Sequence, residues 1–460
     1  MTDRDASPAD RDASPAAALA RLRALVRIPT VSRDDPAAVD AAAFARFREA
    51  LAELYPRVHA QLELESVERD GLLFRWPGGD PSNAPAGGPS VLMAHQDVVP
   101  ADEPGWQHGA FDGAVTGAGA ERRLHGRGAI DDKGSLAGIL EATEALLAEG
   151  HRPRGDVYLF FGADEEVAGT CAEAAVRTLE ARGATPALVL DEGGAVVEGV
   201  FPGVSDPIAV IGVSEKGIAS VELLAEAPGG HASTPVAGGA TARLARAVLA
   251  LDASPAPARL NAPTLRMIET LAPHVRGALR PILGSARRLR GPLARMFARL
   301  GPETAAMVRT TRAVTRLRGS AADNVIAERA SAIVNVRVAV GSSLEEALGE
   351  IRRVVERHGV TARLVSGDEP SPVSPDSGPA WEVLTASIAE VFPAAVATPY
   401  VMLQASDARH FARVSRGVYR FLPFDLSRAE REHLHAIDES IRASTFANAV
   451  RFYAALLRRL

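Results

Sequence analysis

Acidic residues and histidines follow several apolar stretches of this 460-residue sequence. The segment GADEEVAG places Glu165 beside Glu166 directly after an apolar run. Two adjacent carboxylates repel each other. Either both are solvated at the start of a helix, where the helix dipole favours negative charge, or one binds a metal while the other moves protons. The neighbouring motifs decide between these two interpretations.

Four other segments place potential metal ligands beside the glutamate pair. They are AHQDVVP with His95 and Asp97, HGRGAIDDKG with Asp131 and Asp132, VLDEGG with Asp191, and LHAIDES with His435. Imidazole and carboxylate groups suit zinc or a similar divalent ion. Two metals that share a bridging carboxylate need about five protein ligands. The candidates are His95, Asp131, Glu166, Asp191 and His435. Each segment alone also fits ordinary polar surface, a turn or a helix cap.

The elements that would position these residues alternate between strands and helices. The runs PSVLMAHQDVV, GDVYLFFGAD and PALVLDEGG are typical of buried strands, and GSLAGILEATEALLAEG is typical of a helix that ends at Gly150. This alternation predicts an α/β fold, a layered catalytic domain with a largely parallel central sheet. Binding sites in such sheets form beyond the carboxyl ends of the strands, where these polar residues occur.

The pattern changes near Gly217, where strand and helix patterns in the order βαββαβ predict an inserted α+β domain. Its middle two strands are expected in NVIAERASAIVNVRVAV. We expect a flexible tail over 1–15, a catalytic domain over 16–216 and 368–460, and the inserted lid or dimerisation domain over 217–367. The tail prediction rests on the repeated RDASPA and its low apolar content.

An arginine-rich helical insertion is expected within the inserted domain, at about 262–320. Residues 274–318 contain eleven arginines and one acid, mixed with Leu, Ile, Met and Phe. Solvated arginines on a surface helix are the favoured interpretation. An amphipathic element that contacts a membrane or an apolar, anionic substrate is the alternative.

Composition limits the class of protein. The formal net charge is −6, so no global basic character favours nucleic acid. Cys171 is the only cysteine, which excludes an internal disulfide and fits a reducing compartment. The sequence shows neither a signal-peptide pattern nor an apolar run of transmembrane length. These observations predict a cytoplasmic protein without a transmembrane segment.

The ordered motifs HQDVVP, GRGAIDDKG, DEE, LDEGG, GGHASTP and HAIDE resemble those of the co-catalytic di-zinc amidohydrolase and metallopeptidase family. That family includes carboxypeptidase S, glutamate carboxypeptidase, aminoacylase and succinyl-diaminopimelate desuccinylase. SDARHF, YRFLPF and HAIDES look closest to its carboxypeptidase S and N-fatty-acyl-amino-acid hydrolase branch. The resemblance implies two Zn²⁺ per chain, with cobalt or manganese as possible substitutes, and a possible homodimer through the inserted domain.

The resemblance also implies roles for individual residues. His95 and His435 would each bind one zinc, Asp131 would bridge them, and Glu166 and Asp191 would complete the two sites. Glu165 would be the general base and Asp97 the partner that orients His95. A cis peptide is expected at Asp131–Asp132.

Three residues of the inserted domain match positions that contact substrate in the family. His231 in GGHASTP would stabilise the oxyanion, often from a partner subunit, and Asn324 and Arg337 would touch the substrate. For each of the three, a structural role is the alternative. The sequence has NVIA where many relatives have Asn-x-Ile-Pro, and NVR where they have Asp-x-Arg. These departures put the substrate assignment in doubt.

The same branch has Gly-Gly-Thr-Asp where this chain has QASD around Asp407, so the pocket wall is expected to differ. His410 either faces the site or is a buried structural histidine.

The predicted function is hydrolysis of an amide bond next to a free carboxylate, in a peptide or an N-acyl amino acid. A hydrolase specific for N-long-chain-acyl amino acids is the alternative within this class. A catalytically silent scaffold would have lost metal positions, and all five are present. A dinucleotide-binding oxidoreductase is disfavoured because no Gly-x-Gly-x-x-Gly follows the first strand.

Overall fold

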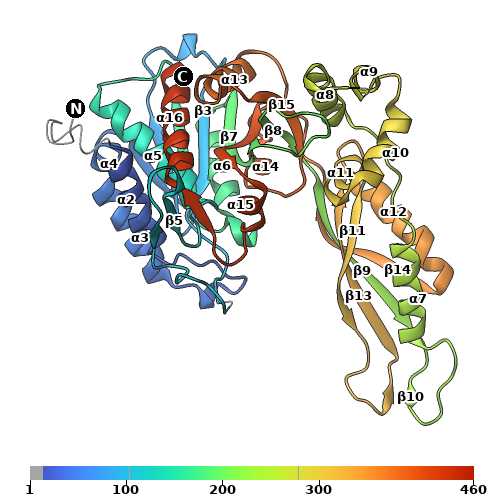
Figure 1. Cartoon of the computed structure of the whole chain (residues 1–460). Coiled ribbons are helices and arrows are strands. Elements are labelled where there is room, and N and C mark those ends of the chain that lie inside the picture. Colours follow the sequence, from blue (N-terminus) through green and yellow to red (C-terminus); the bar gives the residue numbers. More distant parts are fainter. Residues whose placement is uncertain (1–13, 103, 278) are drawn as a thin grey trace.

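The computed structural model describes residues 14–102, 104–277 and 279–460. Figure 1 shows a larger body built around one broad sheet and a smaller, elongated body that extends from it. The predicted tail falls almost entirely on residues 1–13, outside the described residues. Within the described part of the chain, none of the helices has both the length and the apolar character needed to cross a membrane.

The larger body contains an eight-stranded sheet in the order β1-β2-β6-β3-β7-β16-β8-β15. The strands are β1 (Glu63–Val67), β2 (Gly71–Trp76), β3 (Ser90–His95), β6 (Val157–Gly162), β7 (Leu188–Val197), β8 (Ile208–Glu215), β15 (Val396–Met402) and β16 (Val418–Leu426). The pairs β6–β3, β3–β7, β7–β16 and β8–β15 are parallel. All six residues of β3 and of β6 are buried, as expected for strands covered on both faces. The predicted α/β fold with a largely parallel sheet is confirmed.

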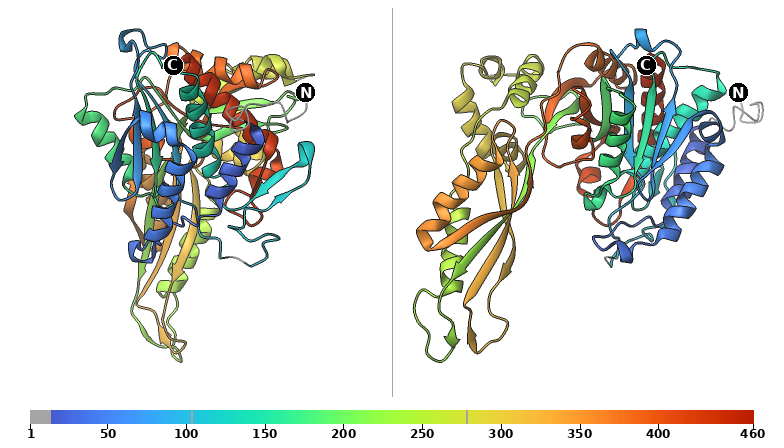
Figure 2. Two further views of the ribbon diagram at one scale, coloured as in Figure 1. Left: turned by 90° about the vertical axis from the view of Figure 1, so that its left-hand side faces the viewer. Right: turned by 180° about the vertical axis from the view of Figure 1, so that it is seen from behind.

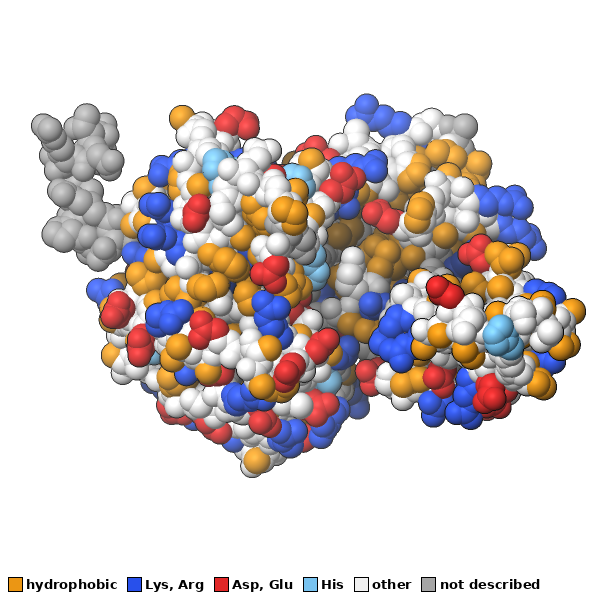
Figure 3. Space-filling view, turned by 90° about the horizontal axis from the view of Figure 1, so that it is seen from below, with side chains coloured by type: hydrophobic (Ala, Val, Ile, Leu, Met, Phe, Trp, Pro, Cys, Tyr) orange, Lys and Arg blue, Asp and Glu red, His pale blue; other side chains and the backbone are white. Residues whose placement is uncertain are grey.

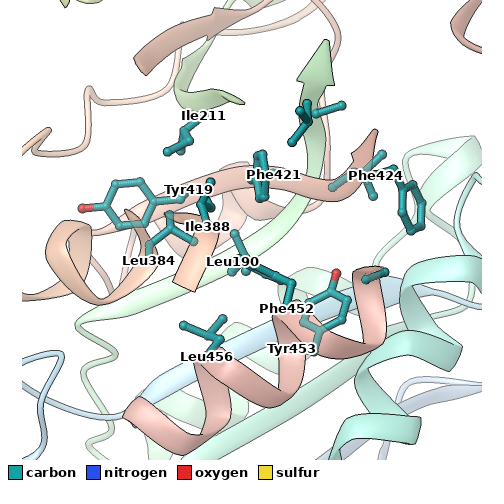
Figure 4. Packing of buried hydrophobic residues seen from close by; sticks show 14 of the residues in the cluster. Leu190, Ile211, Leu384, Ile388, Tyr419, Phe421, Phe424, Phe452, Tyr453 and Leu456 are labelled. Carbon is teal, nitrogen blue, oxygen red and sulfur yellow. The ribbon is translucent and has the colours of Figure 1, made fainter. Parts of the chain in front are cut away.

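Helices cover both faces of this sheet (Figure 2). One apolar core includes α2 (Pro15–Val26), α5 (Lys133–Ala148), α13 (Pro379–Val391) and α16 (Ala443–Arg459). In Figure 4, Phe452 and Leu456 of α16 point toward β16, which carries Phe421. The opposite core includes α6 (Cys171–Ala181) and α14 (Ala408–Phe411). Two packed faces hold the strand ends, and hence any site there, in fixed positions.

Shorter elements complete the larger body. They are α3 (Ala41–Leu54), α4 (Pro56–Gln61), α15 (Arg428–Glu432) and the three-stranded sheet of β4 (Val115–Thr116), β5 (Arg123–His125) and β17 (Ser440–Arg442). The small sheet places the segment after Arg123 beside the segment that precedes Arg442. These two segments carry Asp131 and His435, so the pairing brings two candidate ligands toward each other.

The smaller body is a four-stranded antiparallel sheet in the order β11-β13-β9-β14. Its strands are β9 (Gly217–Glu226), β11 (Thr311–Arg318), β13 (Arg329–Val338) and β14 (Val360–Asp368). Alternate residues of β9 and β13 are buried, because α7 (Ala240–Asp252) and α12 (Leu344–Val355) cover one face. β8 ends at Glu215 just before β9, and β14 ends at Asp368, so we propose domain boundaries at these crossings.

The structure differs from the prediction in which segments form the four strands of the smaller sheet. NVIAERASAIVNVRVAV was expected to supply two strands of this sheet, yet β12 (Val325–Ile326) pairs only with β10 (Gly230–His231) in a separate ribbon. The fourth strand of the sheet is β11, whose sequence TRAVTRLR falls inside the expected helical insertion. Its Val314 and Thr315 are β-branched and favour a strand, and the many arginines obscured this pattern.

The helices of the insertion are α8 (Ala262–Leu271), α9 (Leu279–Gly284), α10 (Arg290–Leu300) and α11 (Pro302–Val308). Leu265, Leu293 and Phe297 are buried in the core of the larger body, while Arg288, Arg295 and their neighbours are exposed. The helices therefore bury their apolar side and leave arginines in solvent, as the favoured interpretation expects.

Candidate metal centre

His95 is the last residue of β3 and is almost completely buried, with 2% of its surface exposed. Its Nδ1 lies 2.9 Å from the carbonyl oxygen of Asp97. A carbonyl oxygen only accepts, so Nδ1 carries a proton and Nε2 is the atom available to a metal. Nε2 lies 3.0 Å from Asp131 Oδ1 and 3.7 Å from Glu192 Oε1.

Asp131 lies between the two histidines. Its Oδ1 faces His95, and its Oδ2 is 3.0 Å from Nε2 of His435. The peptide bond between Asp131 and Asp132 is cis, as the resemblance implies. A carboxylate with one oxygen toward each imidazole has the arrangement that a bridging ligand requires.

Glu165 and Glu166 lie in a short 3₁₀ turn that follows β6. The carboxylate of Asp97 accepts hydrogen bonds from both backbone N–H groups, at 3.3 and 3.2 Å. Asp97 therefore holds this turn as well as orienting His95. Glu166 Oε2 lies 3.2 Å from His435 Nε2. Its Oε1 is buried and meets no hydrogen-bond donor among the described residues, as expected for an oxygen that a cation would satisfy.

The structure differs from the prediction at Asp191. Its Oδ2 accepts a hydrogen bond from the backbone N–H of Ala408 at 2.8 Å, so Asp191 anchors the start of α14. The neighbouring Glu192 instead lies beside His95 and Asp131. Glu192 is therefore a better candidate ligand than Asp191.

A β-bulge explains why Glu192 was missed. In the pairing of β7 with β16, Asp191 is opposite Arg420 and Gly194 is opposite Phe421, so Glu192 and Gly193 have no partner. A bulge redirects the side chains it carries. Gly193 has a φ of 130°, and a Cβ at Gly194 would lie 1.9 Å from a backbone oxygen. The glycine pair in LDEGG was the sequence signal for this bulge.

The acids and histidines of the site perturb one another strongly. Burial, together with Asp131, raises the pKa of Glu192 well above its usual value. Hydrogen bonds to Asp131 and Glu166 raise the pKa of His435 to about 10. Although burial disfavours the charged imidazole, Asp131 and Asp97 also hold the pKa of His95 well above its usual value. A centre with this excess of negative charge favours cations.

Among the residues that the structure describes, the potential ligand atoms form two groups that share Asp131. One contains His95, Asp131 and Glu192, and the other contains Asp131, Glu166 and His435. Within each group the atoms lie within 4.8 Å of one another. Nitrogen and carboxylate oxygen ligands suit zinc, and cobalt and manganese accept the same set. The residues present therefore fit a pair of divalent metals.

The carboxyl group of Glu165 belongs to neither metal group. Burial raises its pKa well above the usual value, and Asp407, Asp131 and Glu166 raise it further. A carboxyl group with a raised pKa can accept and return a proton near neutral pH. The two adjacent glutamates thus have the different surroundings that different roles require.

The structure does not bring two of the predicted substrate contacts to this centre. His231 in β10 and Asn324, directly before β12, are exposed at the far end of the smaller body (Figure 1). Arg337 is half-buried near the other end of β13, where it pairs in register with Thr311 and Ile218. A hollow separates the two bodies on the face shown in Figure 3.

Two residues of the segment after β15 were left open by the sequence. His410 lies outside both metal groups, between Arg409 Nε at 3.2 Å and Glu173 Oε1 at 3.6 Å. Asp407 is buried, and burial followed by Asp191 raises its pKa well above the usual value. Ser406 donates a hydrogen bond to Glu215 Oε1 at 3.0 Å, and Arg420 Nε donates to the same oxygen at 2.5 Å.

Comparisons with known proteins show what this chain is similar to. The pattern of the family described as peptidase family M20/M25/M40 matches residues 91–459. The N-fatty-acyl-amino acid synthase/hydrolase PM20D1 of Xenopus tropicalis is 32% identical over 95% of this chain and 84% of its own length. A probable carboxypeptidase S-like 2 of Dictyostelium discoideum is 33% identical over 90% of this chain and 79% of its own.

The fold is also found among solved structures. A metallo-carboxypeptidase of the M20 family, Sso-CP2 from Sulfolobus solfataricus, superposes with a TM-score of 0.66. The alignment covers 96% of this chain and 98% of the other, at 16% identity. At that identity the likeness concerns the fold alone.

Proposed function

This chain belongs to peptidase family M20/M25/M40, and from that premise we propose that it hydrolyses an amide bond next to a free carboxylate. Metal-dependent amide hydrolysis fits a peptidase family and the two groups of potential metal ligands. The proposal concerns the substrate, a small peptide or an N-acyl amino acid, and the identity of the metals, two Zn²⁺ per chain. The observation that carries the proposal is the pair of ligand groups that share Asp131, with the carboxyl group of Glu165 nearby but in neither group.

The ligands we propose are His95, Asp131, Glu192, Glu166 and His435. Two divalent cations, when bound there, would polarise the scissile carbonyl and the attacking water. Glu165 would take a proton from that water and return it to the leaving nitrogen, so that the amide yields a carboxylic acid and an amine. Asp97 would keep His95 in the required tautomer and fix the turn that carries both glutamates.

Arg337 is the proposed contact for the substrate carboxylate. Its guanidinium carries a bidentate array of donors, and Nε lies 3.3 Å from Asn335 Oδ1. Burial and the nearby Arg409 lower its pKa, so an anion at this position would relieve repulsion between two cations. His231 and Asn324 would act on a partner subunit, because the ribbon that carries them lies far from their own metal centre. The homodimer and the cytoplasmic location stay predictions.

The alternative is a hydrolase specific for N-long-chain-acyl amino acids. It is favoured by the similarity to the Xenopus N-fatty-acyl-amino acid synthase/hydrolase along nearly the whole chain. Carboxypeptidase and acyl-amino-acid substrates share an amide adjacent to a carboxylate, and they differ in the acyl side. The choice therefore depends on the acyl pocket.

The test is a hydrolysis assay with zinc-loaded protein on dipeptides, N-acetyl amino acids and N-long-chain-acyl amino acids. Each substrate is paired with its C-terminal amide, which removes the negative charge. We expect kcat/KM to fall by about 10²-fold on the amides, because the half-buried guanidinium of Arg337 would lose its charged partner. Equal rates on acids and amides would contradict the requirement for a free carboxylate. The relative rates within the acids decide between the two substrate classes.

A further inference from the structure

A buried ion pair lies directly behind the metal centre. Arg127 and Glu439 have 1% and 0% of their side chains exposed, and Arg127 Nη1 lies 2.9 Å from Glu439 Oε2. Desolvating two charges is costly, and their mutual attraction and hydrogen bonds offset that cost. The contacts of this pair therefore indicate what it holds in place.

The carboxylate of Glu439 accepts hydrogen bonds from the backbone segment that leads to Asp131, the proposed bridging ligand. Its Oε1 accepts hydrogen bonds from the N–H groups of Ile130 at 2.8 Å and Asp131 at 3.3 Å. Its Oε2 accepts from Gly128 N–H at 3.2 Å and from Arg127. All four donors belong to residues 127–131. One carboxylate thus fixes the loop that presents Asp131.

Arg127 reaches the other ligand-bearing loop. Its Nη2 donates to the carbonyl oxygen of His435 at 3.3 Å, and its guanidinium lies 5.3 Å from the ring centre of Trp106. Gly126 N–H also donates to the carbonyl of Glu439 at 2.9 Å. His435 has a φ of 59°, a conformation that non-glycine residues adopt at a cost. The pair therefore connects the loop of Asp131 to the loop of His435, and it contacts the second loop at the residue with the unfavourable backbone conformation.

We propose that Arg127 and Glu439 are positioning residues that set the distance between Asp131 and His435. They thereby determine the affinity of the metal position formed by Asp131, Glu166 and His435. The inference rests on the metal centre of the proposed function. The pair contacts the loops of Asp131 and His435, and none of its hydrogen bonds reaches His95 or Glu192. Its loss should therefore weaken one metal position more than the other.

The test is a titration of the metal-free protein with Co²⁺, followed by visible absorption, and a Zn²⁺ competition against a chelator. Glu439→Gln keeps the shape of the side chain and removes its charge. We expect two Co²⁺ per chain in the wild type. In Glu439→Gln one Co²⁺ should bind as in the wild type and the second at least about tenfold more weakly, as for other groups that orient metal ligands. Arg127→Lys should show the same split to a smaller degree.

The matched control is Glu141→Gln. Glu141 is also buried and paired, with Arg21 at 2.6 Å and Tyr55 at 3.0 Å, but it contacts none of the metal ligands. This variant should lose thermal stability and keep both Co²⁺ affinities. If Glu439→Gln behaves like Glu141→Gln, the pair is only structural and the proposal is overturned.

Two outcomes separate this inference from the proposed function. If Glu439→Gln fails to fold, unchanged Co²⁺ affinities in Arg127→Lys would overturn the inference, and a selective loss would support it. The readout is binding, so it does not depend on the substrate. A wild type that binds two Co²⁺ and hydrolyses no amide of the panel would contradict the proposed function alone.

Discussion

Acidic residues occur in very different surroundings in the two bodies of this protein. At the strand ends of the larger body, Asp131, Glu166 and Glu192 are largely buried and face histidines. On the open face of the smaller sheet, Glu222 pairs with Arg363, whose side chain is 73% exposed. Water screens the second kind of pair and leaves the first kind strongly interacting. Burial at a strand end therefore distinguishes acids suited to chemistry from acids that keep a surface soluble.

The largest effect should come from substituting Glu192, which tests whether Glu192 rather than Asp191 binds the metal. Glu192→Ala removes a candidate ligand, so one metal should be lost and turnover should fall below detection. Asp191→Asn keeps the hydrogen bond from Ala408 through its remaining oxygen and should retain both metals. Metal analysis of the two purified variants measures this. Loss of metal in Asp191→Asn with full occupancy in Glu192→Ala would restore the original prediction.

The second effect concerns His231, which would make the smaller body part of a partner's active site. His231→Ala should lower kcat by about 10²-fold, the usual effect of removing one oxyanion donor, and leave metal content unchanged. His358→Ala, at another histidine of the same body, should be neutral. Mixing His231→Ala with the inactive Glu165→Ala should recover activity through hybrid dimers. Full activity of His231→Ala as a monomer would exclude this role.

A third, smaller effect is expected on stability near the His435 loop. Despite burial, Arg442, Ser427 and Arg123 lower the pKa of Glu430 to about 2. A depressed pKa stabilises the fold above the ordinary value of 4.5, and this contribution is lost as the pH falls toward 2. Glu430→Gln should therefore cost about 2 kcal/mol at pH 7. Denaturant unfolding of wild type and variant at pH 7 and pH 3 checks this, and an equal difference at both pH values would contradict it.

The smallest effect is expected at the surface pair of the smaller body. Glu222→Gln should change the free energy of unfolding by less than about 0.5 kcal/mol, because Arg363 is well solvated. The same denaturant titration measures it. A loss as large as that of Glu430→Gln would remove the distinction between the two regions.

The strands of the larger body could be predicted well because short, continuous stretches of sequence indicate each of them. Apolar runs predict buried strands, and the polar residue that ends each run must lie at the same sheet edge. This reasoning predicts His95 and Glu166, which follow β3 and β6. Asp131 and His435 lie instead in the segments after β5 and before β17, beside the small sheet, and their predicted roles rest on the family resemblance. The bulge that presents Glu192 in place of Asp191 depends on how β16 pairs with β7, and strand alternation does not reveal it.

The smaller body was harder to predict for a physical reason. Strand β11 carries many arginines and lies at the edge of its sheet, where one side is solvated, so its apolar pattern is weak. The proposed roles of His231 and Asn324 depend on how a partner subunit would be placed beside them. The sequence of a single chain does not show how two subunits are arranged.

The most direct test of the account compares Glu165→Gln with Glu166→Gln, measuring metal content and turnover in both variants. We predict that Glu165→Gln keeps two metals per chain and loses about 10²- to 10⁴-fold in kcat, the contribution of a general base. Glu166→Gln should lose metal together with activity. If both variants lose metal equally, or if Glu165→Gln retains its turnover, the division of roles between the adjacent glutamates is contradicted.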